Sequence, residues 1–469
     1  MNFKSLLFSI TAGVLLFSCS NKSENVEESK PEGVPTYLNL TISLPGPALG
    51  KALPDDYNPD GIYEGNDGVE TLDIYMLSAD GTIEGKRFSG TDISSTGSTV
   101  SPSQPFRTTS GYKTVYIVLN DPNPLETSIT SEDDLVDVTG LARTRTVNGV
   151  NYDIITMTGK SDSKIYIEPD ITVQAVNNGA NRISVAVNRV ASRVIVTSSA
   201  ASTIVNGDGV TLGTVSNVTW SVAQGTTEIY WISQPNYVSY GYNYVPALGE
   251  YINQADTYYD YSDLSTPVPV PALPAAGDGY KSLTGKFVFE NTHLYGADTR
   301  TTGYRKGNTA YVLVKTVFTP DPAQIADGGT LTNGTFYVGA ADGNIYSSKQ
   351  AAQDAVQNQK VSVYSGGKML YYAWLNPDSI TNPLNSPVIR NNIYHINITG
   401  FSSLGYNWNP LYPEDPDTTT PENPDPKPGN PDEPEIPIDP IDPLTPEETY
   451  MTVEVTVTDW YVHSYDIEF

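Results

Sequence analysis

The sequence predicts an all-β protein with a few short helices, divided into two tandem domains with polar tails. Three observations indicate this class. Glycine and proline are abundant, at 38 and 35 residues, and they separate short runs of apolar and polar residues. A hydrophobic content of 38% is high enough to bury cores. The length of 469 residues suits two domains of ordinary size plus tails.

The charge and the scarcity of certain residue types exclude several function classes. Acidic residues number 54 against 26 lysines and arginines, which gives a formal net charge of −28. Such a surface repels phosphate backbones, so nucleic acid is not an expected partner. One cysteine and three histidines exclude an internal disulfide framework and a zinc site built from several cysteines or clustered histidines.

The sequence predicts no enzyme and no cofactor. His293, His395 and His463 are scattered among strand and loop patterns, and no nucleophile elbow, phosphate-binding glycine loop or paired zinc-binding histidine motif accompanies them. A glycosidase pair is the one catalytic option that stays open, because the separation of two carboxylates is set by the fold.

The chain begins with the features of an export signal. A short basic start precedes an apolar run over residues 6–17 that is too short to span a bilayer, so residues 1–18 are a predicted signal peptide. The sequence Leu16-Phe17-Ser18-Cys19 resembles the lipobox of bacterial lipoproteins. The resemblance implies that Cys19 becomes a lipid-bearing N-terminus, which anchors an outer-membrane lipoprotein exposed at the cell surface.

A half-buried strand is predicted within residues 19–51, after a polar tether that ends near residue 35. Between residues 37 and 44 apolar and polar side chains alternate, so that one face of the strand is apolar. The loop that follows carries a single basic residue, Lys51. The apolar face consists of Leu38, Leu40, Ile42 and Leu44.

The middle of the chain shows strand patterns with few helical ones. Strands are predicted over residues 69–77, 114–119, 165–167 and 392–400, and a helix over residues 348–357. We place a domain boundary near residue 188. This gives an N-terminal domain over residues 52–187 and a C-terminal domain over residues 188–410.

The composition changes completely at residue 411. Residues 411–448 contain 12 prolines and 12 acidic residues, with Lys427 as the only basic one. Proline lacks a backbone donor and like charges repel, so this segment is a predicted extended, flexible spacer. Residues 449–469 then form a predicted strand that needs a sheet to join, because alone it exposes an unpaired edge. Its apolar face consists of Met451, Val453, Val455 and Val457 and continues at Tyr461.

The two terminal strands match in spacing, with four apolar positions each. If proteolysis removed the first strand, its groove could accept the last strand of another subunit, through main-chain hydrogen bonds and alternate side chains. Because the giving and accepting surfaces differ, such a contact does not close and generates a filament. The alternative is that both strands pair within one monomer.

Several segments together resemble one known family. They are the lipobox, the basic loop, residues 188–194 (Asn-Arg-Val-Ala-Ser-Arg-Val), residues 390–398 (Arg-Asn-Asn-Ile-Tyr-His-Ile-Asn-Ile) and the acidic spacer before a valine-rich strand. In this order they are similar to the fimbrillins, the type V pilins of Bacteroidales, and most similar to minor-fimbrium shaft subunits. The resemblance implies a lipoprotein precursor of two β-sandwich-like domains that is cut and then polymerised outside the cell by donor-strand exchange.

The resemblance also implies partners and a cleavage position. The partners are other fimbrillin subunits, a maturation protease, the membrane through the lipid anchor before maturation, and a host protein or glycan that the fimbrium adheres to. Cleavage is expected between Lys51 and Ala52. The family's protease prefers arginine whereas this loop offers lysine, so a trypsin-like or lysine-accepting protease is an alternative.

The loop after residue 55 contains candidate ligands for a metal ion. Oxygen-bearing side chains follow the spacing of a calcium loop, with glycine at the sixth position. However, Pro59 stiffens the loop and the last residue is shorter than the usual glutamate, so a plain acidic turn is the favoured interpretation and no metal is expected. The candidate ligands are Asp56, Asn58, Asp60 and Asp67.

A second function stays open because of a tyrosine-rich segment. Eight tyrosines lie within residues 237–261, and aromatic rings at this density suit contact with a glycan as well as packing in a core. The alternative function is therefore a monomeric outer-membrane surface lipoprotein that binds polysaccharide. That class has no need for a removable first strand or for a strand beyond a long spacer.

Overall fold

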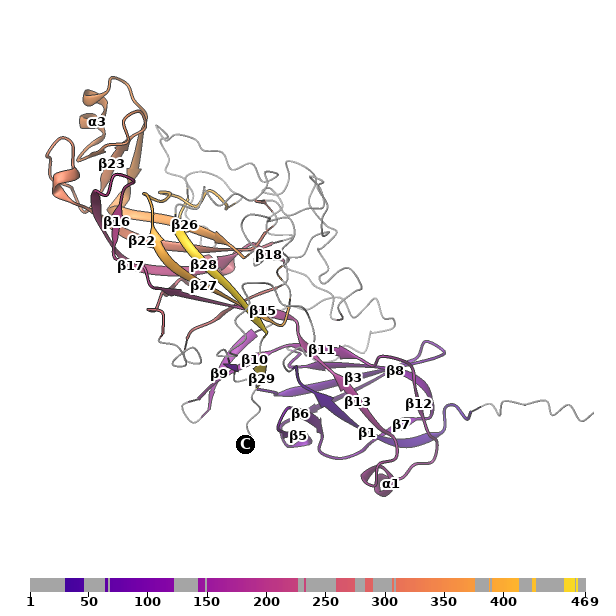
Figure 1. The fold of residues 1–469 in the computed structure, drawn as a ribbon. Helices are drawn as coiled ribbons and strands as arrows, with labels where there is room; N and C mark the ends of the chain where they lie inside the picture. Colours follow the sequence, from indigo (N-terminus) through magenta and orange to yellow (C-terminus); the bar gives the residue numbers. More distant parts are fainter. Residues whose placement is uncertain are drawn as a thin grey trace, which may run out of the picture.

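A computed structural model shows an all-β chain with short helices, arranged as an N-terminal lobe and a C-terminal lobe along one long axis (Figure 1). The predicted fold class is confirmed. No helix within the described part of the chain is both long and apolar enough to cross a membrane. The structure describes residues 30–45, 64–65, 68–121, 142–147, 150–226, 232, 259–274, 283–289, 306–307, 309–375, 388, 390–412, 424–426, 451–459 and 461–462.

The first sheet of the N-terminal lobe has the N-terminal strand in its interior. On one side β1 (Pro35–Ser43) runs parallel to β13 (Arg182–Ala186). On the other side β1 pairs antiparallel with β7 (Phe106–Thr109) and then with β6 (Thr99–Pro102). β5 (Ile93–Thr96) extends the sheet beyond β6. Both edges of β1 are therefore used in hydrogen bonding.

The second sheet of the N-terminal lobe faces the first, and the two enclose a core. Leucine, isoleucine, methionine and valine side chains from β1, β3, β8 and β13 meet between the sheets. The second sheet has the order β14 (Asn188–Arg189), β11 (Met157–Lys160), β8 (Gly111–Leu119), β3 (Thr71–Ser78) and β4 (Ile83–Ser89), and β12 (Ile165–Ile167) also pairs with β8. A separate hairpin consists of β9 (Ala142–Val147) and β10 (Val150–Ile155). The lobe also contains the helix α1 (Val173–Asn177) and the 3₁₀ turn η1 (Gly90–Asp92).

The C-terminal lobe is a second sandwich. One sheet runs β21 (Lys286–Phe289), β15 (Ala191–Ser198), β27 (Asn392–Phe401) and β28 (Met451–Asp459), and the other runs β16 (Thr203–Val205), β17 (Thr211–Ala223), β22 (Tyr311–Pro320) and β26 (Lys368–Trp374), with β20 (Val268–Pro269) on β17. A large cluster of buried apolar side chains fills the space between them.

A small sheet with a helix lies at the end of the C-terminal lobe away from the N-terminal lobe (Figure 1). The helix α3 (Lys349–Ala355) begins after Ser348, whose hydroxyl accepts a hydrogen bond from the backbone N–H of Ala351, as expected for an N-cap. It lies within the predicted helix. The sheet consists of β24 (Ile345–Tyr346), β23 (Phe336–Gly339) and β25 (Val361–Tyr364).

The remaining elements of the described chain are short. The strands are β2 (Glu64–Gly65), β18 (Gly225–Thr226), β19 (Tyr259–Asp260) and β29 (Tyr461–Val462). The 3₁₀ turns are η5 (Ser262–Ser265), η7 (Pro322–Gln324) and η8 (Ser365–Gly367).

The chain passes from one lobe to the other at Val190. β14 pairs with β11 of the N-terminal lobe, whereas β15 begins the C-terminal lobe one residue later. Val190 is buried in a cluster that joins Tyr75 and Tyr116 of the N-terminal lobe to Phe289 of the C-terminal lobe. The outer face of β3 and β8 is therefore covered where the lobes meet.

Candidate functional site

The slot that holds β1 is the most complete candidate site for binding a peptide segment. The register joins Leu40 to Ile183 and Ile42 to Val185 across the parallel pair with β13. The four apolar side chains of the predicted strand face the core, and the most exposed of them, Leu44, is only 6% exposed. A strand in this slot is thus bound by main-chain hydrogen bonds on two sides and by four apolar contacts.

A polar clamp holds the start of β1. The hydroxyl of Thr36 donates to the backbone oxygen of Glu168 (2.8 Å) and accepts from the backbone N–H of Ile171 (3.0 Å) and from Nδ2 of Asn181 (3.2 Å). Asn181 also donates to the backbone oxygen of Tyr37 (3.0 Å). Thr36 is buried, so its hydroxyl depends on these partners for its hydrogen bonds. The alternation pattern marked the apolar face but missed this clamp, because its partners come from distant loops.

The C-terminal strand lies within its own chain in this structure. β28 pairs antiparallel with β27, and Ile396 faces Val455 across the pair. β28 is the last strand of its sheet within the described part of the chain, so only one of its edges is paired there. Two residues further on, β29 pairs in parallel with β2 of the N-terminal half. Both terminal strands are therefore paired inside one monomer, which was the alternative in the sequence analysis.

The acidic spacer contacts the C-terminal lobe at its first two residues, Leu411 and Tyr412, which pack in the cluster around Tyr261, and again at Asp425. Asp425 is buried, and its Oδ1 accepts from Nζ of Lys315 (2.7 Å) and from Nζ of Lys368 (3.1 Å). Its backbone oxygen accepts from the N–H of Asn409 (2.9 Å). The segment predicted as an extended, flexible spacer is thus held against the lobe at Asp425.

Two segments that carry the family resemblance, residues 188–194 and 390–398, meet at the lobe junction. β15 and β27 run side by side in parallel, and the backbone N–H of Asn391 donates to the oxygen of Ala191 (3.0 Å). The buried guanidinium of Arg189 donates to Oδ1 of Asn391 (2.8 Å), and that of Arg193 to the backbone oxygen of Leu283 (3.0 Å). These arginines hold chain segments together, which is a structural role.

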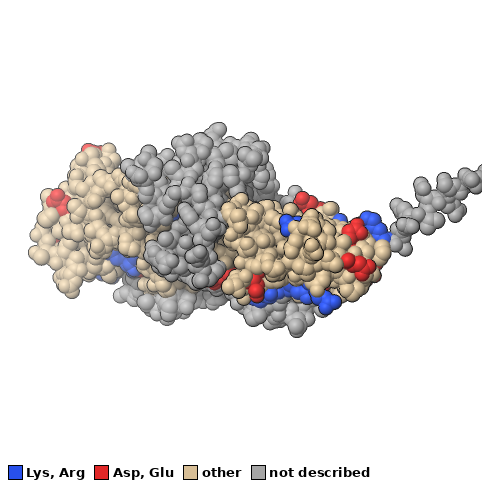
Figure 2. Space-filling view, turned by 90° about the horizontal axis from the view of Figure 1, so that it is seen from below, with Lys and Arg blue, Asp and Glu red and all other residues tan. Residues whose placement is uncertain are grey.

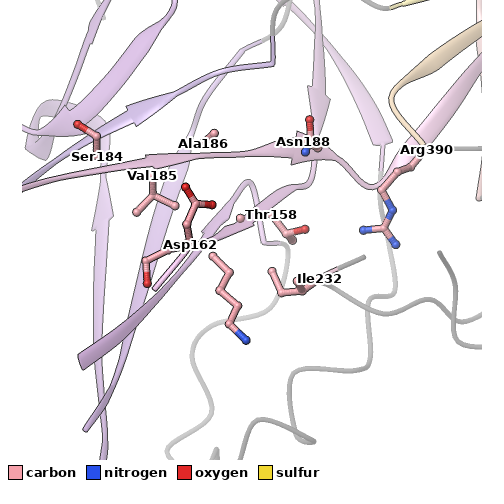
Figure 3. A pocket seen from close by; sticks show the side chains of 11 residues that line it. Thr158, Asp162, Ser184, Val185, Ala186, Asn188, Ile232 and Arg390 are labelled. Carbon is pink, nitrogen blue, oxygen red and sulfur yellow. The ribbon is translucent and has the colours of Figure 1, made fainter. Parts of the chain in front are cut away.

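A cavity of about 630 Å³ opens beside the slot, between β11 and β13 (Figure 3). Its lining is mixed, with Ser184 toward one end and Arg390 at the other. The two strands approach so closely here that a Cβ on Gly159 would collide with the backbone oxygen of Ala186. The cavity therefore borders the strand that lies parallel to β1.

Two buried ionisable groups have displaced pKa values. Burial raises the pKa of Asp73 to about 7, although the Arg87 guanidinium, 3.3 Å away, partly opposes this. Burial lowers the pKa of His395 to about 4, and its Nε2 lies 2.7 Å from the hydroxyl of Thr197. His395 is thus a neutral core residue at physiological pH. The other two histidines lie outside the described residues.

Two members of the tyrosine-rich segment are described, and both are core residues. Tyr259 and Tyr261 are buried in a cluster with Tyr311 and Trp374. The hydroxyl of Tyr261 donates to Oε1 of Gln224 (2.8 Å). These two rings therefore contribute packing and present no free face for a glycan.

Several predicted positions lie outside the described residues. They are Cys19, the cleavage pair Lys51 and Ala52, and the loop residues Asp56, Asn58, Asp60 and Asp67. Within the described part of the chain, no group of three histidine, cysteine, aspartate or glutamate side chains could hold a metal ion. Figure 2 shows charged side chains of both signs on the N-terminal lobe, and a mostly uncharged described surface on the C-terminal lobe.

Comparisons with known proteins agree with this architecture. Residues 362–466 match the family model "Major fimbrial subunit protein type IV, Fimbrillin, C-terminal". The minor fimbrium subunit Mfa1 of Porphyromonas gingivalis is 33% identical over 493 aligned positions, which cover 96% of this chain and 96% of that protein.

Two solved structures are also similar, at lower identity. A fimbrilin (fimA) from P. gingivalis W83 is 15% identical, with a TM-score of 0.44, and the match covers 92% of this chain and 99% of that one. The tip fimbrial protein Mfa3 from P. gingivalis is 13% identical, with a TM-score of 0.35 and coverages of 91% and 100%. On the extent and identity of the match to the minor fimbrium subunit, the chain belongs to the fimbrillin family.

Proposed function

We propose that this fimbrillin is a shaft subunit of a surface fimbrium that polymerises head to tail by strand exchange. The precursor is exported as a lipoprotein through Cys19, with β1 in the slot of its own N-terminal lobe. Cleavage between Lys51 and Ala52 separates β1 from the rest of the lobe. The C-terminal strand of a neighbouring subunit then takes the slot, and the resulting fimbrium adheres to a host protein or glycan.

The observation that carries this proposal is the position of β1 at the start of the chain and in the interior of a sheet. β1 fills the core with four apolar side chains and uses both of its edges. Its covalent link to the rest of the lobe runs through the loop that contains Lys51. A cut in this loop leaves β1 bound by non-covalent contacts alone. Its departure opens an apolar slot with two unpaired edges, which is a site for strand addition.

The C-terminal strand supports the proposal from the other end. It repeats the alternation of β1, and among the described strands it lies at a sheet edge, where one set of hydrogen bonds holds it. The spacer between Asp425 and Met451 can extend by on the order of 80 Å at about 3.1 Å per residue. This reach lets the strand leave its own lobe and enter a neighbour. Because slot and strand are different surfaces, the contact repeats without closing and builds a filament.

The proposal is tested by brief trypsin treatment of the purified precursor, followed by N-terminal sequencing and negative-stain microscopy. We expect a new N-terminus at Ala52 together with filaments. Cleavage at this site without assembly would contradict strand exchange. It would instead favour a monomeric surface lipoprotein, which a polysaccharide-binding screen would then examine.

Two variants separate the steps of maturation. Deletion of residues 449–469 should leave folded, cleavable monomers and abolish filaments, because the slot then has no strand to accept. Replacement Lys51→Ala should leave lipidated, uncut precursor in the membrane fraction. Normal filaments from the deletion would overturn the mechanism, and unchanged maturation of the Lys51→Ala variant would place the cut elsewhere.

A further inference from the structure

We propose that Thr449 and Tyr450 set the register and direction of the incoming strand, with Thr449 replacing Thr36 in the polar clamp. This inference rests on the proposed function, since it concerns how the C-terminal strand of one copy sits in the slot of another. It adds a residue that determines specificity, and it predicts a single alignment of donor and slot.

The clamp demands a hydroxyl at this position. Thr36 gives its one proton to the oxygen of Glu168, and its lone pairs receive the N–H of Ile171 and the amide of Asn181. The side chain is only 2% exposed, so water does not replace these partners. A serine or threonine hydroxyl can donate and accept at once, whereas an apolar side chain or a carboxylate cannot. An incoming strand without a hydroxyl here leaves the half-buried N–H of Ile171 without its partner, whereas Asn181 and the oxygen of Glu168 keep their bond to each other.

The C-terminal sequence supplies that hydroxyl at the matching position. In β1 a Thr-Tyr pair stands directly before the first apolar residue, Leu38, and in the C-terminal segment Thr449-Tyr450 stands directly before Met451. The aromatic residue matches as well as the hydroxyl. Tyr37 lies with its ring centroid 6.0 Å from the guanidinium of Arg107, a cation–π contact that Tyr450 can repeat.

Aligned on this pair, each residue of β1 corresponds to the residue 413 positions later. The four buried apolar positions of β1 then receive Met451, Val453, Val455 and Val457. The outward-facing Thr41 and Ser43 correspond to Glu454 and Thr456, so the polar face also stays polar.

Other alignments fail at the clamp or in the core. A shift of one residue turns the apolar face outward. A shift of two residues in one direction places Glu447 in the clamp. The opposite shift places Met451 there and puts Asp459 in the buried position of Leu44. A strand entering in the reverse direction also brings Asp459 to the clamp, where an ionised carboxylate cannot donate to the oxygen of Glu168.

Cysteine pairs can read the alignment directly in assembled filaments. Ser43 and Ala186 are partners across β1 and β13, and both are exposed. Ala186→Cys is combined in turn with a cysteine at residue 452, 454, 456 or 458, and Cys19 leaves with the cleaved segment. Adjacent strands lie within disulfide range. We expect an intersubunit disulfide for Thr456→Cys, whereas residues 454 and 458 report the two-residue shifts and residue 452 reports the reversed strand.

A matched pair of substitutions tests the hydroxyl itself. Thr449→Val removes the hydroxyl at nearly constant shape, and we expect the subunit concentration needed for filament assembly to rise about tenfold because the N–H of Ile171 loses its partner. Thr449→Ser should restore assembly. Thr456→Val, at the position that corresponds to the exposed Ser43, is the control and should leave assembly unchanged.

The outcomes separate this inference from the proposed function. Two results would overturn the register and leave strand exchange intact, provided that the filaments still require residues 449–469. One is a cross-link at residue 452, 454 or 458, and the other is normal assembly with Thr449→Val. Filaments that form without residues 449–469, or a cleaved chain that never assembles, would overturn the proposed function and the register together.

Discussion

The proposed exchange of strands in the slot predicts that one substitution weakens the precursor and spares the filament, while its counterpart does the opposite. Ile42 of β1 is fully buried in the core of the N-terminal lobe. Its counterpart in the donor is Val455. Ile42→Ala should therefore loosen the N-terminal lobe before cleavage only, and Val455→Ala should loosen it only in the assembled filament.

The structure gives the size of the first effect. Truncation of a buried isoleucine to alanine costs roughly 2–5 kcal/mol, as lost apolar burial plus the cavity left behind. Each 1.4 kcal/mol is about a factor of ten, so the opening equilibrium of the lobe should rise about 30-fold or more. The outward-facing Thr41→Ala, as a control, should change stability by less than about 0.5 kcal/mol. Val455→Ala removes less surface, and we expect about 2 kcal/mol in the filament.

Native-state hydrogen exchange at β13, which runs parallel to the slot strand, measures these effects within one lobe. Peptides from residues 182–186 are followed in the uncut precursor and in washed filaments for each variant. If Ile42→Ala weakens protection in filaments as much as in the precursor, β1 has stayed in its slot and the exchange mechanism is wrong. An uncut precursor unaffected by Ile42→Ala would contradict the core position of the strand.

Three further predictions concern charged groups outside the slot. Burial raises the pKa of Asp73 in the folded protein to about 7, so between about pH 4 and 7 the native state binds more protons than the unfolded state. The free energy of unfolding therefore falls as the pH rises through this range. Asp73→Asn should flatten this dependence and stabilise the N-terminal lobe at pH 8, as measured by urea unfolding. His395 has a folded pKa lowered to about 4, so stability falls as pH drops from about 6.5 toward 4, and His395→Gln should flatten that acid limb in the C-terminal lobe. Asp425→Asn should weaken the contacts with Lys315 and Lys368 and speed hydrogen exchange at the N–H of Asn409, which donates to the backbone oxygen of Asp425, and high salt should reduce the difference from the unmodified protein.

The local pattern of the sequence predicted strands well where one face is buried. Alternation between residues 37 and 44 predicted a strand whose apolar side chains point inward, and β1 has this arrangement because a period of two matches the pleat of a sheet. The helix within residues 348–357 also followed from local signals, an apolar face and the capping Ser348. The short helix α1 was not predicted, since five residues carry too little periodicity.

The partners of each strand could not be predicted from local pattern. The parallel pairs β1–β13 and β15–β27 join segments that are far apart in sequence, and alternation says nothing about which strand lies next to which. The clamp around Thr36 depends on a loop that brings Asn181 into place with a φ of 44°. Asp425 is one of twelve acidic residues in its segment, and nothing in the composition distinguishes it from the others.

In the proposed exchange the C-terminal strand has two positions, on β27 and in a neighbour's slot, and the difference between them gives assembly its direction. On β27 the strand has pairing on one edge, whereas the slot offers β13 on one side and β6 and β7 on the other, with a core that accepts four apolar side chains. In the proposed exchange the slot therefore offers the same sequence main-chain pairing on a second edge. Before cleavage β1 occupies it from within the same chain, at an effective concentration that a neighbour's strand cannot match. In the proposed mechanism cutting the loop removes this advantage, so proteolysis decides when the slot becomes accessible to a neighbour's strand, and subunits stay monomeric until then.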